Sequence, residues 1–241
     1  MECDAVNHDN CHSILDPTSS PSETKRMKIE IELPHIEPQA FRVIQNYKRD
    51  NSLQMDLTYN EAFDVYAAYQ TYKSIPQDLV NHCWKIVINN CNTEAQMCSG
   101  YNFAMASQSF KMLDFFLTKI LNNISAFLKC DNFVTISTDT LITILQQICL
   151  NCTEIELFEA CVHWCEKQPD YKRENLRKFM EPFLGHIRFL SMSPSEFMAN
   201  KQIIDVLSDQ ELGAIVKKIN GKECDDWPST ISTITSSRIR D

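Results

Sequence analysis

Four cysteines and one histidine carry side chains that could bind a metal ion or act as thiols: Cys149, Cys152, Cys161, His163 and Cys165. A structural zinc site needs ligands that converge on one point, usually as close pairs on knuckles or hairpins. On a helix, Cys161 and Cys165 would lie one turn apart, whereas His163 would be rotated by about 200° from Cys161, at roughly 100° per residue. Because these side chains diverge, the spacing predicts core or surface positions and no metal site.

Thiol chemistry is also poorly supported by the sequence. A redox Cys-x-x-Cys pair usually has its first thiol at a helix N-terminus after a strand, whereas Cys149 ends an apolar run with helical character. A Cys–His nucleophile pair stays open, because such partners meet only in three dimensions. The chain has no phosphate-binding loop, dinucleotide fingerprint or His-Glu-x-x-His motif. The sequence therefore predicts a protein that is not an enzyme and has no cofactor, with a thiol- or metal-dependent protein as the alternative of another class.

Composition limits the compartment and the partners. The chain has 241 residues, 44% of them hydrophobic, with eleven cysteines and a formal net charge of -9. This charge argues against nucleic-acid binding, which needs a basic surface. The first residues lack a signal-peptide apolar region, and no window approaches eighteen consecutive apolar residues. We expect a cytoplasmic protein without a membrane segment, in which most cysteines are reduced and serve as small apolar residues.

The best-marked element is a helix over 153–167 (TEIELFEACVHWCEK). Thr153 and Glu156 form a capping box, in which each side chain accepts a hydrogen bond from the backbone N–H of the other residue. Apolar residues recur at helical spacing on one broad face, and Glu156, Glu159, His163 and Glu166 lie on the other. The spacing predicts an amphipathic helix whose broad face packs on neighbouring elements.

The N-terminal part divides into a leader, a strand and helices. Residues 1–27 are polar and predict a disordered leader. Residues 28–33 (KIEIEL) alternate apolar and charged side chains, which predicts one short strand. Three helices should follow, with starts marked by Pro38, by a capping box of Thr58 and Glu61, and by Pro76.

Helical spacing continues to residue 219. Residues 92–127 carry two apolar faces, and later helix starts are marked by Ser137, by Ser193 with Glu196, and by Ser208 with Glu211. Gly221 marks the end of the last helix. Residues 222–241 are rich in serine and threonine and predict a disordered tail.

The stretch from 133 to 211 resembles a BACK domain, the helical module that follows a BTB (POZ) domain in cullin ubiquitin-ligase adaptors. The resemblance rests on Phe133, Ile136, Thr140 and Leu141, on Asn151 to Glu154, on Leu157 to Ala160 with Trp164, on Ile187 to Phe189 with Met192, on Glu196 and Phe197, and on Leu207 to Glu211. These features are closest to the BTB-BACK subfamily that continues into a C-terminal PHR domain. Residues 28–91 resemble the C-terminal half of a BTB domain, in the order strand and three helices.

The resemblance implies a mainly α fold: a helical BACK-type array of α-hairpins, preceded by the C-terminal helical half of a BTB domain with one short strand. The expected organisation is a disordered leader over 1–27, a truncated BTB domain over 28–91, a BACK domain over 92–221 and a disordered tail over 222–241. The N-terminal half of the BTB domain and the PHR domain are missing from this pattern. Because that half carries the dimerising surface, a BTB-type homodimer is not expected.

The resemblance also implies protein partners, namely a cullin and a ubiquitination substrate. Family members bind the cullin through helices that correspond to 41–49 and 77–85, and through the helical pair that bridges BTB to BACK. The interface residues expected here are Phe41, Tyr47, Arg49, Gln77 and Asn81. Arg49 stands where the family commonly has an aromatic residue that faces the cullin. The alternative is therefore a truncated or degenerate isoform that does not recruit cullin and acts only by occupying partners.

Overall fold

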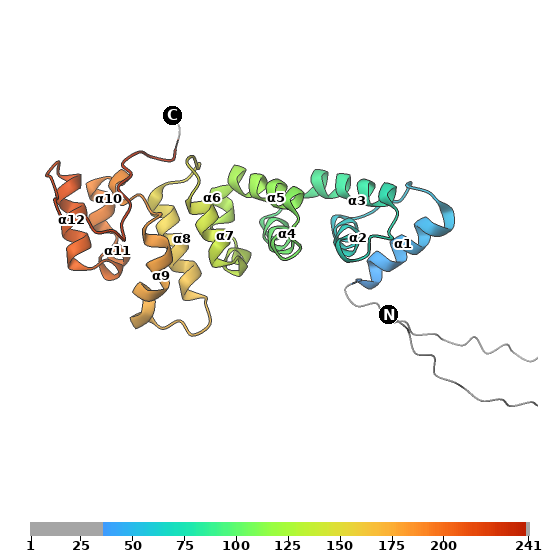
Figure 1. The fold of residues 1–241 in the computed structure, drawn as a ribbon, viewed down its shortest axis with the longest axis horizontal. Coiled ribbons are helices and arrows are strands. Elements are labelled where there is room, and N and C mark those ends of the chain that lie inside the picture. The colour runs from blue at the N-terminus through green and yellow to red at the C-terminus, as the bar shows by residue number, and fades with distance from the viewer. Residues whose placement is uncertain (1–35, 240–241) are drawn as a thin grey trace, which may run out of the picture. The chain divides into compact units, whose positions relative to one another are not determined.

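The computed structural model describes residues 36–239 (Figure 1), so the predicted leader over 1–27 and strand over 28–33 lie outside the described residues. Within this range the fold is mainly α, as predicted, and contains no strand. The α-helices are α1 (Pro38–Asp50), α2 (Tyr59–Thr71), α3 (Gln77–Asn90), α4 (Glu94–Ala106), α5 (Phe110–Asn122), α6 (Ile124–Phe127), α7 (Thr138–Leu145), α8 (Glu154–Glu166), α9 (Leu176–Leu184), α10 (Pro194–Ala199), α11 (Lys201–Val206) and α12 (Asp209–Ile219). Short 3₁₀ helices lie at η1 (Asp131–Thr135), η2 (Arg173–Asn175) and η3 (Phe189–Ser191).

Helix starts follow the capping signals of the sequence. The boxes predicted at Thr58, Thr153, Ser193 and Ser208 are all formed, each with its glutamate at the third helical position. A fifth box, Thr93 with Gln96, begins α4. Gly221 follows the last helix with φ 71°, the left-handed conformation that glycine adopts at no steric cost. Local chemistry therefore sets most of the helix ends.

Helix α8 lies at the centre of the C-terminal helices and packs against α9 and η1. Its broad face is buried, including Leu157, Phe158, Cys161 and Cys165. The indole Nε1 of Trp164 donates to the carbonyl of Ile136 at 2.9 Å. The same ring stacks edge-on against Phe183 of α9 at 5.5 Å between centroids. The hydrogen bond satisfies the indole N–H, so the large ring is buried without the cost of an unpaired donor.

Helices α4 and α5 pack closely against each other. Gly100 of α4 is buried, and the ring of Phe116 of α5 lies directly over it. Phe116 is fully buried and contacts the ring of Phe115 at 5.0 Å between centroids. Glycine is required here because a side chain on α4 would occupy the space of this ring.

Replacing Gly100 with alanine should destabilise the protein. The added methyl group would overlap the ring of Phe116, which is fully buried. Overpacking of this kind costs about 1–3 kcal/mol, which exceeds the gain of about 1 kcal/mol from the better helix propensity of alanine. Gly213 is the matched control, because it lies inside α12 with open space around it, and its alanine variant should be slightly more stable. Urea unfolding of both variants measures the difference, and equal stability of the two would contradict the packing argument.

The C-terminal segment differs from the predicted disordered tail. Residues 222–239 have no regular helix, yet they lie against the BACK-like helices through fixed contacts. Ile231 is buried, and the indole Nε1 of Trp227 donates to its carbonyl at 3.0 Å. Thr230 donates to Glu211, and Arg238 is buried in an ion pair with Glu154. Two carboxylates of the helical core, far away in the sequence, thus contact a segment for which the composition predicted a disordered tail.

Candidate protein-interaction surface

The predicted interface residues of α1 divide between surface and core. Phe41 is partly exposed, with 37% of its surface accessible. Arg49 is exposed and its guanidinium makes two hydrogen bonds to the carboxylate of Asp50, at 2.8 and 3.0 Å. Tyr47, which was also predicted at the interface, is buried, and its ring packs inside the helical core. Phe41 and Arg49 thus remain as the surface groups of this helix.

The predicted residues of α3 form a small polar cluster with the end of α2. Gln77 and Asn81 lie one turn apart, and the amide of Gln77 donates to Oδ1 of Asn81 at 3.0 Å. The hydroxyl of Tyr69 donates to Oε1 of Gln77 at 2.8 Å. Nζ of Lys73 lies 4.3 Å from the centroid of the Tyr69 ring. The sequence did not identify Tyr69 or Lys73, because only the turn between α2 and α3 brings them to this cluster.

A third exposed feature lies at the turn between α4 and α5. Phe110, the first residue of α5, is 85% exposed, and Met105 near the end of α4 is 40% exposed. Phe110 lies about 200° around α5 from Met112, at roughly 100° per residue, and Met112 and Phe116 are fully buried on the other face. A large exposed aromatic ring is the kind of group that anchors protein interfaces. Phe110 was not among the interface residues predicted from the sequence.

The cysteines and the histidine do not form a reactive group. Cys152, Cys161 and Cys165 are buried, and His163 is exposed on the other face of α8. Across residues 36–239, no three His, Cys, Asp or Glu side chains are grouped to hold a metal ion. Burial raises the pKa of Cys152 and of Cys165 to about 12. These thiols are protonated at neutral pH, and the nucleophilic thiolate form is scarce.

Comparison with models of protein families identifies a known domain among these helices. The model of the BACK family (BTB And C-terminal Kelch) matches residues 97–213. A BACK domain is thus detected over this stretch, which is just under half of the chain. The BACK domain is a protein-interaction module of BTB proteins and is not a catalytic family. No solved structure significantly matches the chain.

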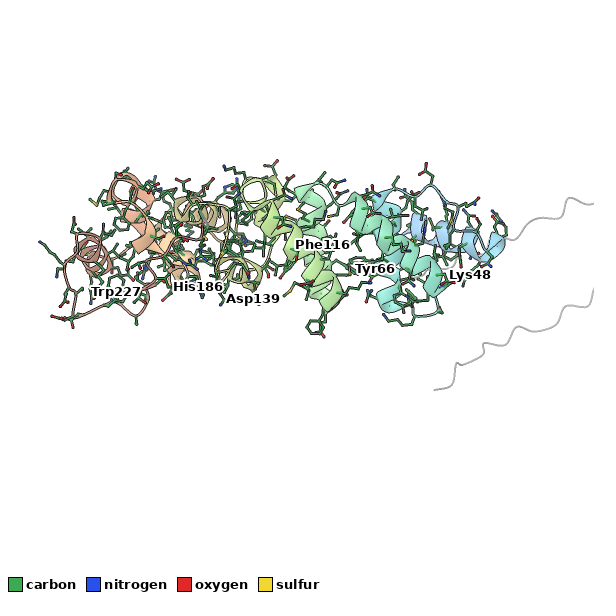
Figure 2. The ribbon with its side chains drawn as sticks, turned by 90° about the horizontal axis from the view of Figure 1, so that it is seen from above. Lys48, Tyr66, Phe116, Asp139, His186 and Trp227 are labelled. Atoms are coloured by element: carbon green, nitrogen blue, oxygen red, sulfur yellow. The ribbon has the colours of Figure 1, made fainter. Side chains whose placement is uncertain are left out.

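The BACK domain match begins in α4 and ends in α12, so it includes α8 and its capping box. Phe110 and the buried face of α8 belong to the BACK domain, whereas the polar cluster of Tyr69, Lys73, Gln77 and Asn81 precedes it. In the range 36–239, none of the helices is long and apolar enough to cross a membrane. Figure 2 shows Lys48 and Tyr66 in the helices before the BACK domain, and Asp139 and His186 within it.

Proposed function

We propose that this chain is a protein-interaction module that acts as a substrate adaptor of a cullin-RING ubiquitin ligase in the cytoplasm. The observation that carries the proposal is the BACK domain over 97–213, a module typical of BTB adaptors of these ligases. Such an adaptor works by position: it holds a substrate near the ubiquitin-charged enzyme and raises the effective concentration of the reacting groups. No side chain of the chain takes part in the chemistry.

The proposed cullin surface consists of Phe41, Arg49, Gln77 and Asn81, extended by Phe110. In this proposal residues 28–91 correspond to the C-terminal half of a BTB domain, and the BACK domain extends over 92–221. Phe41 and Phe110 are exposed aromatic side chains, and burial of such rings dominates the affinity of many interfaces. The polar cluster at α3 offers hydrogen-bonding groups that suit the rim of an interface. The substrate would bind outside this surface. In the family that this chain resembles, a PHR domain usually has that role.

A second function is favoured by the environment of Arg49. The resemblance places an aromatic residue at this position in good cullin binders, and here the guanidinium is solvated and paired with Asp50. An exposed charge contributes little to an interface core. In this alternative the chain does not recruit cullin and acts by occupying the partners of complete adaptors.

Direct binding to the N-terminal domain of a cullin separates the two functions. The adaptor proposal expects binding in the micromolar range by calorimetry. Replacing Phe41 or Phe110 with alanine should weaken this binding at least about tenfold, because truncation of a central aromatic anchor costs about 2 kcal/mol or more and 1.4 kcal/mol corresponds to about tenfold. Ile148 is the matched control: it is 77% exposed, lies between α7 and α8, and is outside the proposed surface.

One result would decide against the adaptor role, and another would decide against the proposed surface. No binding of the wild-type chain at tens of micromolar would favour the partner-occupying alternative. Equal losses for the Phe41, Phe110 and Ile148 variants would indicate nonspecific apolar association, and would remove the proposed surface even if the chain binds cullin.

A further inference from the structure

The segment that follows Trp227 is held at two separate points. Ile231 and Ser232 are buried, and so is Arg238, of which only 2% is exposed. The five residues between them, 233–237, are all exposed. Arg238 is therefore a single buried anchor at the end of an exposed linker, and its release would not require any other part of the segment to leave the core.

The guanidinium of Arg238 occupies a pocket built from the BACK domain. Its Nε donates to Oε1 of Glu154 at 2.5 Å. Nη1 donates to the carbonyls of Leu145 and Gln147 at 2.6 and 2.5 Å, and Nη2 donates to the carbonyl of His186 at 2.7 Å. The guanidinium group has five N–H donors in a fixed planar arrangement, and these contacts engage four of them. A lysine ammonium, with three donors on a compact group, could not reproduce this set.

The pocket is organised by groups other than Arg238 itself. Leu145 is the last residue of α7, and His186 lies two residues after the end of α9. Carbonyls at helix C-termini carry partial negative charge and favour a cation. Glu154 begins α8, and its Oε2 accepts from the backbone N–H of Arg188 at 3.0 Å, which fixes the carboxylate in place. The side chain of Arg188 donates to the carbonyl of Ser236 at 3.1 Å, so it also contacts the incoming segment.

The backbone of the segment is also recognised. The N–H of Leu150 donates to the carbonyl of Arg238 at 3.2 Å. The end of the segment is thus held by one backbone hydrogen bond and one buried arginine, and the residues before this arginine are exposed. Nothing in these contacts requires the peptide to belong to the same chain.

We propose that this pocket is a docking site for an arginine on an extended peptide segment of a partner protein, and that Arg238 is its resident, displaceable occupant. This inference rests on the proposed function only in assuming that the BACK domain binds protein partners, and it names a chemical class for one of them. A tethered ligand has an effective concentration in the millimolar range, so the chain's own segment should exclude weak competitors. The pocket would become available to a partner peptide that makes further contacts along the exposed linker. It would also become available after any event that releases Arg238.

A labelled peptide tests the pocket directly. The probe is a fluorescein-labelled peptide of residues 231–239 (ISTITSSRI), and the protein is the full chain with Arg238→Ala. We expect this variant to bind the peptide at least tenfold more tightly than the wild-type chain does, because its pocket is empty. The same peptide with lysine in place of its arginine should bind the variant at least tenfold more weakly. Arg173→Ala, which removes an exposed arginine of η2 outside both proposed surfaces, should behave as the wild type.

A second variant keeps the test valid if Arg238→Ala does not fold. Arg238→Lys retains the charge and the packing of the stem but lacks the planar donors, so it should also bind the arginine peptide more tightly than the wild type. Equal binding by the wild type and both variants, or equal binding of the arginine and lysine peptides, would overturn the proposal. The assay contains no cullin, so a chain that binds cullin but not the peptide would refute only the pocket.

Discussion

Replacing Glu154 with glutamine should lower the free energy of unfolding by about 3–5 kcal/mol, the range measured when one partner of a buried ion pair is removed. The side chains of Glu154 and Arg238 are only 4% and 1% exposed, so water cannot replace the lost charge. Glutamine has nearly the same shape as glutamate, but it leaves the guanidinium of Arg238 without a buried counter-ion. Its amide also offers one acceptor oxygen to two donors, Nε of Arg238 and the backbone N–H of Arg188.

Chemical unfolding of the variant measures this effect, and Glu159→Gln is the matched control. Glu159 lies on the same helix, but it is exposed and contacts Asn200 at the surface. Its substitution should change stability by no more than about 0.5 kcal/mol, the usual range for surface positions. If Glu154→Gln and Glu159→Gln were equally stable, the buried pair would contribute nothing, and the C-terminal segment would be held by its other contacts alone.

The helices were predictable because their signals are local. A capping box joins residues three apart, so Thr153 with Glu156 and Ser208 with Glu211 could be recognised in the sequence and are formed in the structure. Helical spacing likewise identified the buried face of α8. These features depend on 3.6-residue geometry and backbone hydrogen bonding, which act within one element.

The candidate sites were less predictable because they depend on contacts between distant residues. Arg238 and Glu154 are 84 residues apart, and nothing in the Ser/Thr-rich composition around Arg238 indicates burial. Tyr47 was assigned to a surface from the family pattern, and tertiary packing buries it instead.

Acid should weaken the fold through Glu211. Burial by itself would raise the pKa of this carboxyl, but hydrogen bonds from Arg177, Thr230 and Ser208 outweigh burial and lower the pKa to about 2. Arg177 alone makes two of them, at 2.8 and 2.9 Å. The carboxylate is thus held in its charged form by the folded state, and the usual value of 4.5 applies after unfolding. At about 1.36 kcal/mol for each pKa unit, this difference corresponds to roughly 3 kcal/mol of stability.

The sign of this effect fixes the pH range of the test. Because the folded pKa lies below the unfolded one, the contribution is complete above about pH 5 and is lost as the pH falls toward 2. Glu211→Gln has no carboxyl to titrate at this position, so it should be about 3 kcal/mol less stable than the wild type at neutral pH. The gap should shrink by about 1.4 kcal/mol by about pH 3.5, from the same linkage relation.

Urea unfolding at both pH values measures the gap, with the exposed Glu174→Gln as control. A gap that stays constant between the two pH values would mean that Glu211 acts through packing and not through its charge, because only a titrating carboxylate can make the difference depend on pH.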